Sequence, residues 1–194
     1  MRILLTGFEP FGGSDMNSSW ETATRVGMRS FEGVEVVVRQ LPVSFRMVGD
    51  KISGLLEEIR PDVMVMLGQR GKGTSIDVER IAINLMYSEK GDNDGYMPDE
   101  VPIMDDAPLA CSSNLPVRRL KDSLTEKGIE ARVSNSAGLY VCNCAYYEAL
   151  RAVELNGLEI RVVFVHVPKI SDDNDLKNCT DAISILIETI KTII

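Results

Sequence analysis

Short apolar runs and longer amphipathic stretches alternate along most of this chain. The apolar runs are rich in β-branched residues, as buried strands are, and they lie at residues 2–7, 34–43, 62–68, 130–134 and 159–167. The amphipathic stretches have helical spacing and lie at residues 18–29, 45–60, 115–127, 141–155 and 173–193. Nearly continuous apolar strands separated by helices are what a parallel sheet covered on both faces requires. The pattern therefore predicts an α/β fold, a three-layer α/β/α arrangement with a mostly parallel central sheet.

One stretch, residues 74–114, departs from this alternation. Its sequence "SIDVERIAINLMYSEKGDNDGYMPDEVPI" predicts extended segments around a polar loop instead of a crossover helix. Long irregular insertions in compact domains are often functional or form contacts between subunits. We therefore expect this stretch to contribute to a site or to an oligomer contact.

Composition and charge narrow the class of protein. The chain has 194 residues, 44% of them hydrophobic and 26% charged. This composition favours a single globular domain that spans residues 1–194. A formal net charge of -8 leaves no excess of Lys and Arg to neutralise nucleic acid or an anionic membrane, so neither is expected as a partner. The N-terminal apolar run is too short for a signal peptide, and no run reaches the roughly 18 residues of a membrane helix.

The cysteine pattern gives no sign of a metal site. Cys111, Cys142, Cys144 and Cys179 lack the paired spacing of zinc ligands, and the chain has a single histidine. We therefore expect no metal and no other cofactor. Reduced thiols and the lack of a targeting segment predict a cytoplasmic protein.

Residues that could carry chemistry follow the predicted strands. In an open α/β sheet, ligands bind where the carboxyl ends of strands lead into loops. "TGFEPFGG" follows the first strand, "GQRGKG" the third and "SNSAGLYVCN" the fourth, while His166 lies near the end of the fifth. We expect these segments to meet at one edge of the sheet.

Cys142 is the candidate nucleophile. The helix that follows "SNSAGL" is expected to begin near Tyr140, which places Cys142 in its first turn. Backbone N–H groups and the helix dipole stabilise a thiolate there, and the same N–H groups can hold an oxyanion. The alternative is that Cys142 is a small core residue, which is the commoner role of a free cysteine. Cys144, two residues on, is expected to point elsewhere.

A thiol nucleophile needs a base, and His166 is the only histidine that could serve as one. The alternative is a hydrogen-bonded core histidine on an apolar strand. A third group, a carboxylate, would orient the imidazole. Glu79, Glu89, Asp105 and Asp106 are all in the region, and their spacing does not choose among them.

The segment "TGFEPFGG" lacks the glycine pattern of a phosphate-binding loop. Phe8 and Phe11 are three residues apart around a proline turn, which can place both rings on one side as walls of a flat apolar slot. Packing of one or both rings in the core is the alternative. The segment favours an uncharged ligand over a phosphate.

Taken in order along the chain, "LLTGFEPFGG", "NSSWE", "ERIAINL", "GDNDG", "SNSAGLYVCN" and "FVHVP" resemble the pyroglutamyl peptidase I family, the pyrrolidone-carboxylate peptidases. The resemblance covers nearly the whole chain. It implies an α/β/α cysteine peptidase that removes an N-terminal pyroglutamyl residue from peptides and commonly forms tetramers. It also implies a role for each matching residue, with Glu79, Cys142 and His166 as the catalytic triad and Phe8, Phe11, Tyr140 and Val141 as substrate contacts.

The chain departs from the family pattern at three places. Ser18 stands where a Pro is usual, Gly73 where an Arg is usual, and "YSEKG" at residues 87–91 replaces an Asp, an Arg, an apolar residue and a Pro. Glu89 in place of a cation and Lys90 in place of an apolar wall are expected to alter the pocket. Two alternatives to an active peptidase therefore stay open. They are a degenerate homologue and a hydrolase of another lactam or amide.

Overall fold

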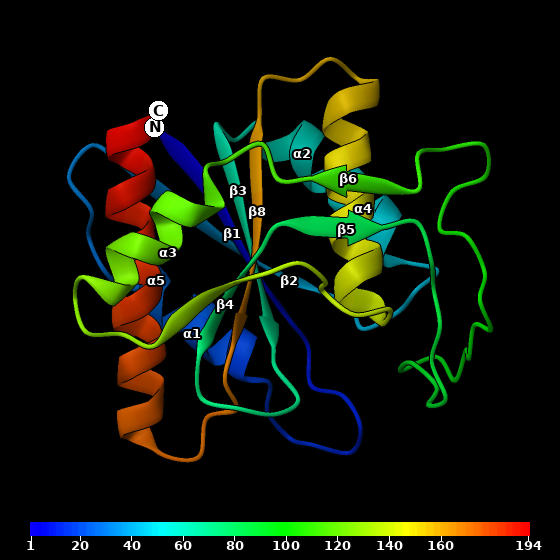
Figure 1. Ribbon diagram of the computed structural model, residues 1–194, viewed down its shortest axis with the longest axis horizontal. Coiled ribbons are helices and arrows are strands. Elements are labelled where there is room, and N and C mark those ends of the chain that lie inside the picture. Colours follow the sequence, from blue (N-terminus) through cyan, green and yellow to red (C-terminus); the bar gives the residue numbers. More distant parts are fainter.

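The computed structural model describes residues 1–194 and contains one central six-stranded sheet (Figure 1). In spatial order its strands are β2 (Glu35–Leu41), β1 (Arg2–Phe8), β3 (Val63–Gln69), β8 (Arg161–Val167), β4 (Ile76–Glu79) and β7 (Ala131–Ser134). Every pair of neighbours is parallel except β8 and β4, which are antiparallel. The sheet is therefore mostly parallel, as the apolar runs predict, but β4 and β7 run opposite to the other four strands.

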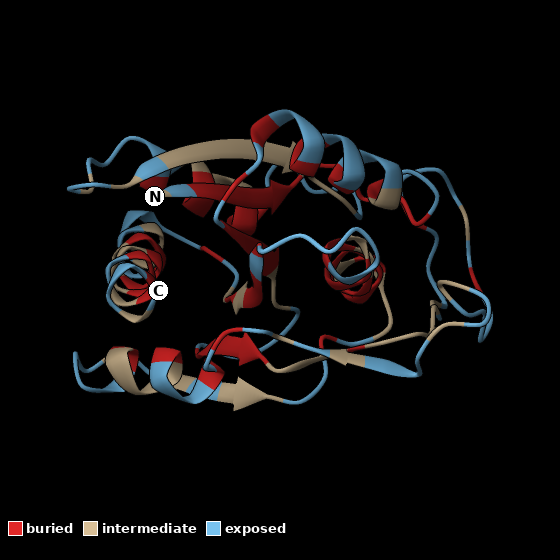
Figure 2. Ribbon diagram, turned by 90° about the horizontal axis from the view of Figure 1, so that it is seen from above, coloured by how far each residue is buried: buried red, intermediate tan, exposed pale blue.

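Helices cover both faces of this sheet (Figure 2). One core cluster of 25 buried residues includes side chains of α2 (Val48–Ile59) and α4 (Val141–Leu155). The other cluster, of 23 buried residues, includes side chains of α1 (Ser18–Gly27), α3 (Val117–Thr125) and α5 (Asp173–Ile193). Two cores of similar size confirm the three-layer α/β/α arrangement.

The starts of two helices differ from the expected ones. Helix α2 begins at Val48 instead of residue 45, because Ser44 to Met47 form a turn in which the Ser44 carbonyl accepts the Val48 N–H. Helix α3 begins at Val117, directly after Pro116. Proline has a fixed φ and no N–H to donate, which suits the start of a helix.

Residues 74–114 form strands and a long arm, as expected of extended segments. The first of these strands is β4, which belongs to the central sheet. Strands β5 (Ile81–Ile83) and β6 (Ala110–Ser112) pair antiparallel in a separate two-stranded sheet. Residues 84–109 connect them in a loop that extends beyond α4 (Figure 1). The loop is anchored by Asp92, whose carboxylate accepts the backbone N–H groups of Phe45, Asp94 and Tyr96.

The direction of β7 corrects one expectation. The segment "SNSAGLYVCN" was expected to leave the sheet at the edge where β1, β3 and β8 end. Strand β7 pairs parallel with β4, and β4 runs antiparallel to β8. The carboxyl end of β7 therefore lies level with Phe164, deeper in the sheet. Residues 135–140 then return toward the shared edge before α4 begins. An apolar run has the same pattern in either direction, so the sequence does not reveal the reversal.

None of the five helices is both long and apolar enough to cross a membrane.

Candidate active site

A cavity of about 230 Å³ lies where the loops after β1, β2 and β3 meet the start of α4. Eleven residues line it, namely Phe8, Phe11, Asn17, Val43, Gln69, Gly71, Ala137, Tyr140, Val141, Cys142 and His166. The residues that the family resemblance marks as catalytic or substrate-binding all line it except Glu79, which lies behind His166. A larger groove of about 1300 Å³ beside α5 is lined mostly by polar residues and contains none of them.

Aromatic side chains form the walls of this cavity. The rings of Phe11 and Phe45 lie 6.2 and 5.4 Å from the ring of Tyr140. Phe8 is almost fully buried, and its ring lies 6.3 Å from that of Phe164. Phe8 therefore fills both roles weighed for it, because it packs in the core and also lines the cavity. Apolar walls of this kind suit an uncharged, flat ligand.

Gln69 gives the cavity a polar group that sequence reasoning did not single out. Its side-chain oxygen accepts hydrogen bonds from the Ser18 backbone N–H at 2.8 Å and from the Ser18 hydroxyl at 2.9 Å. These two bonds fix the orientation of the amide and leave its NH₂ group free to donate. The sequence offered a signal for Gln69, since this residue belongs to the quoted motif "GQRGKG" at the end of a strand. Asn17, Gly71 and Ala137 were missed as well, although each belongs to a quoted motif, whereas Val43 carries no such signal.

Cys142 lies in the first turn of α4, as expected. Tyr140 precedes the helix without a side-chain cap, so the first N–H groups of α4 lack side-chain partners. The sulfur of Cys142 lies above β3 at Gly68. A Cβ atom added to Gly68 would be 3.0 Å from Sγ of Cys142 and 2.8 Å from the ring of Phe164. The backbone of β3 can therefore approach the sulfur only because residue 68 is glycine.

Cys144 points away from the cavity. It is buried, its thiol lies 3.9 Å from the carbonyl oxygen of Phe45, and burial raises its pKa to about 12, with a further contribution from Glu148. The expectation that Cys142 and Cys144 face different ways is confirmed.

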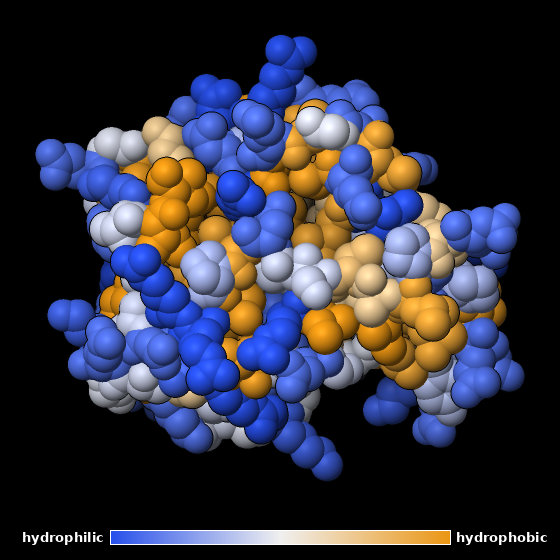
Figure 3. Space-filling view, turned by 45° about the horizontal axis from the view of Figure 1, so that its top comes forward, coloured by the Kyte–Doolittle hydropathy of each residue, from blue (hydrophilic) through white to orange (hydrophobic).

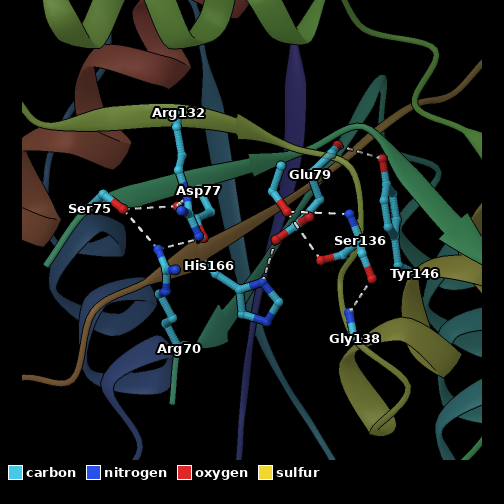
Figure 4. Close-up of polar contacts among 10 residues, drawn as sticks. Arg70, Ser75, Asp77, Glu79, Arg132, Ser136, Gly138, Tyr146 and His166 are labelled. Atoms are coloured by element: carbon cyan, nitrogen blue, oxygen red, sulfur yellow. Dashed lines mark hydrogen bonds and ion pairs between the residues drawn. The ribbon is translucent and has the colours of Figure 1, made fainter. Parts of the chain in front are cut away.

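The structure brings His166 and Glu79 together. Nδ1 of His166 lies 2.8 Å from Oε1 of Glu79, and both side chains are largely buried (Figure 4). Burial by itself would lower the pKa of His166, but hydrogen bonds to Cys142 and Glu79 and their charges raise it to about 10. The other acids lie elsewhere, with Glu89 on the exposed loop beside Tyr87.

A second carboxylate near the imidazole, that of Asp77, is paired with two arginines. Asp77 stands two residues before Glu79 on β4 and is the register partner of His166. Its carboxylate lies 2.6 Å from Nη1 of Arg70 and 2.8 Å from Nε of Arg132, as Figure 4 shows. Asp77 is thus neutralised by two guanidinium groups, which leaves Glu79 as the one carboxylate that contacts the ring.

The divergent segment 87–91 touches the cavity wall from outside. The Tyr140 hydroxyl donates to the carbonyl oxygen of Gly91 at 3.3 Å. Lys90 and Glu89 are exposed, and neither lines the cavity. The expectation that Lys90 replaces an apolar wall is therefore wrong in this structure, and the aromatic wall remains complete without residue 90.

The other two departures have local explanations. Ser18 is buried and holds Gln69 through two donors, whereas a Pro at this position would have neither. At Gly73, a Cβ atom would lie 3.5 Å from the guanidinium carbon of Arg70. Arg70 therefore occupies the space beside residue 73, and its guanidinium supplies a cation there.

Comparison with known proteins gives consistent matches over the chain. A family model described as "Pyroglutamyl peptidase" matches residues 1–193. The pyrrolidone-carboxylate peptidase of Thermococcus onnurineus is 44% identical over 172 residues, covering 89% of this chain and 86% of that protein. The corresponding protein of Bacillus cytotoxicus is 36% identical over 174 residues, covering 90% and 81%.

Solved structures agree with these sequence matches. The crystal structure of Bacillus amyloliquefaciens pyroglutamyl peptidase I superposes with a TM-score of 0.92 at 32% identity, covering 97% of this chain and 95% of that one. A mutant pyrrolidone carboxyl peptidase from P. furiosus superposes with a TM-score of 0.93 at 31% identity, and both chains are covered completely.

Proposed function

The chain belongs to the pyroglutamyl peptidase family, and from this premise we propose that it removes the N-terminal pyroglutamyl residue from peptides as a cysteine peptidase. One observation carries the proposal. A mainly apolar cavity of about 230 Å³ ends at a cysteine in the first turn of a helix, beside a histidine bonded to a buried glutamate. Such an arrangement supplies a nucleophile, a base and an orienting acid at the mouth of a slot for a small ring.

The cavity suits the lactam ring of pyroglutamate. The ring is small, flat and uncharged, so it fits between the aromatic side chains of Phe8, Phe11 and Tyr140. Its carbonyl oxygen can accept a hydrogen bond from the free NH₂ group of Gln69, whose orientation is fixed by Ser18. Val141, next to the nucleophile, completes the slot. A prolyl residue has the same ring without the carbonyl, and it would leave the Gln69 donors unsatisfied.

The first half of the reaction forms an acyl enzyme. The Cys142 thiolate attacks the carbonyl carbon of the scissile bond, and the free N–H groups at the start of α4 hold the resulting oxyanion. His166, protonated at Nε2, then gives its proton to the departing amine as the C–N bond breaks. Glu79 accepts a hydrogen bond from Nδ1 throughout and keeps the ring oriented.

The second half releases pyroglutamate. Neutral His166 takes a proton from a water molecule, which attacks the thioester carbon between Cys142 and the acyl group. The C–S bond breaks, the free pyroglutamate leaves, and the thiolate and imidazolium are restored. None of these steps calls on a metal or a cofactor, and the described residues contain no cluster of acidic, His and Cys side chains that could hold a metal ion.

An intact cavity favours an active enzyme over the two alternatives. A degenerate homologue or a hydrolase of another amide would follow from damage to the slot by residues 87–91. None of these residues lines the slot, and their one hydrogen bond to a lining residue is that of the Gly91 carbonyl with Tyr140. The triad candidates and the aromatic walls are all in place.

Hydrolysis of a pyroglutamyl anilide tests the proposal, with the matching prolyl anilide as the control substrate. We expect turnover of the first, no measurable turnover of the second, and complete loss of activity after alkylation of the thiols. Equal rates on both anilides, or activity that survives alkylation at Cys142, would exclude this function.

We also propose that the protein is a cytoplasmic homo-oligomer, a tetramer by its family resemblance. All four cysteines are free thiols, which fits a reducing compartment. Exposed apolar side chains of Met97, Val101 and Leu109 lie on the arm between β5 and β6, and Figure 3 shows hydrophobic surface on that side. Exposed apolar surface often marks a protein contact. Light scattering of the purified protein tests the tetramer, and a monomeric mass would exclude it.

A further inference from the structure

The carboxylate of Glu79 has few contacts that fix its position. Oε1 is bonded to His166, whereas Oε2 is buried and has no hydrogen-bond partner. An unpaired buried oxygen costs free energy and gives the side chain no directional hold. The place of this carboxylate therefore depends on how the backbone of Glu79 is anchored.

The phenol of Tyr146 supplies such an anchor. Tyr146 is fully buried, and its hydroxyl donates to the backbone carbonyl oxygen of Glu79 at 3.2 Å. It stands four residues after Cys142 on α4, so both side chains leave the helix on the same face. In Figure 4 the phenol reaches from this helix to the end of β4.

The ring of Tyr146 also supports the base. Its centroid lies 5.6 Å from the ring of Phe164, and the ring of Phe164 lies 4.9 Å from that of His166. Tyr146 thus contacts the strand of the acid through its hydroxyl and supports the histidine through Phe164. It belongs to the same helix as the candidate nucleophile.

We propose that Tyr146 is a positioning residue, whose hydroxyl holds Glu79 where its carboxylate orients His166. The inference rests on the proposed function in that it takes Cys142, His166 and Glu79 to act together. Tyr146 does not line the cavity, and its hydroxyl acts through the backbone carbonyl of Glu79.

A purely structural role would be to dock α4 on the neighbouring strands. Asn143 already does this, because its side chain exchanges hydrogen bonds with the backbone of Ile83 at 2.8 and 2.9 Å and donates to Leu85. Removal of the Tyr146 hydroxyl is therefore expected to leave α4 docked, while the Glu79 carbonyl keeps its place in the sheet and loses the Tyr146 donor.

The variant Tyr146→Phe tests this inference, and Tyr147→Phe is its matched control. Tyr147 is the next residue on α4, is also buried, and donates its hydroxyl to the Pro108 carbonyl at 2.6 Å, away from the site. We expect kcat on a pyroglutamyl anilide to fall about tenfold in Tyr146→Phe with KM changed by less than about twofold. Tyr147→Phe is expected to keep both values.

A measurement independent of turnover completes the test. His166 is the only histidine, so its ring signal can be followed by NMR during a pH titration. We expect a lower pKa of His166 in Tyr146→Phe than in the wild type, and no change in Tyr147→Phe. In a Glu79→Gln background the kcat effect of Tyr146→Phe is expected to disappear, because the two changes remove one function.

Equal kcat losses in the two tyrosine variants, together with unchanged titration of His166, would overturn the inference. So would a tenfold effect that persists in the Glu79→Gln background. If the wild type does not cleave the anilide, the proposed function fails, while the titration of His166 still decides the role of Tyr146.

Discussion

The side-chain oxygen of Gln69 accepts both the backbone N–H and the hydroxyl of Ser18. The relationship determines the chemistry of the cavity, because it turns the amide so that Gln69 presents donors and not an acceptor to the ligand. Under the proposed function, a donor at this place selects a ring that carries a carbonyl group. The pairing also explains why a polar residue at position 18 is buried.

Ser18→Ala should weaken substrate binding. The variant keeps the backbone N–H but loses both bonds of the hydroxyl, the one donated to Gln69 and the one accepted from the Ile170 N–H, so Gln69 becomes less well fixed. We expect KM for a pyroglutamyl anilide to rise about threefold to tenfold with kcat little changed, as loss of a hydrogen bond of about 1 kcal/mol implies. Ser14→Ala is the control, because the Ser14 hydroxyl bonds within an exposed loop. The same KM in both variants would contradict the role given to Ser18.

Only one of the two neighbouring cysteines should matter for hydrolysis. We expect Cys142→Ser to lower kcat by at least about a thousandfold, since it removes the nucleophile, and Cys144→Ser to keep most of the activity. Mass spectrometry after brief alkylation at neutral pH should find the label on Cys142. Cys144 should stay unlabelled, because it is buried and its pKa is raised to about 12. Loss of activity in Cys144→Ser, with activity kept in Cys142→Ser, would make Cys144 the nucleophile instead of Cys142.

Glu79→Gln should reduce kcat by about two to four orders of magnitude, with KM nearly unchanged. The amide can still contact His166, but it neither fixes the tautomer nor stabilises the imidazolium. Steady-state kinetics on the anilide measure both values. Glu89→Gln is the control, because Glu89 is exposed and its carboxylate accepts a hydrogen bond from the Tyr87 hydroxyl, away from His166. Comparable losses in the two variants would show that Glu79 has no special role.

The free energy of unfolding should depend on pH through the titration of His166. Its folded-state pKa of about 10 is above the ordinary 6.5. The charged ring therefore contributes fully to the free energy of unfolding below about pH 6.5, and this contribution is lost as pH rises through about 10. We therefore expect the advantage of the wild type over Glu79→Gln in unfolding free energy to shrink between these pH values. Denaturant unfolding at pH 6.5, 8 and 10 measures it. An advantage that grows with pH would contradict the raised pKa.

Lys90→Ile should have little effect on catalysis. Lys90 is exposed and outside the cavity, so we expect kcat and KM on neutral anilides to change by less than about twofold. Preference for an acidic residue after the scissile bond should be equally unaffected. A large gain in activity on this substitution would show that the ammonium group enters the slot in solution.

Much of the fold could be predicted because the apolar runs and amphipathic stretches record burial directly. The direction of β4 and β7 could not, since an apolar strand looks the same in both directions. The choice of Glu79 among four acids needed either the family resemblance or the structure. Glu79 and His166 are 87 residues apart, and their contact depends on the register of β4 against β8.

Only some of the other site residues could be predicted from the sequence. Cys142 and His166 follow from a helix start and a strand end, which local patterns reveal. Gln69 was in a quoted motif, but its importance comes from the partner that turns its amide, which lies 51 residues away. The place of Lys90 was misjudged because the path of residues 87–91 depends on contacts of Tyr140 and the 92–96 turn.

The position of β8 between β3 and β4 has a consequence for how the chain folds during synthesis. Until residues 161–167 leave the ribosome, β2, β1 and β3 can form one group and β4 with β7 another, with no strand to join them. Each group then has an unpaired edge, which makes the nascent chain prone to aggregation. Glu79 is made long before the histidine that it contacts, so a chain that stops before β8 has the proposed acid and nucleophile but not the proposed base. Under the proposed mechanism, proteolytic activity can therefore arise only after the last strand has joined the sheet.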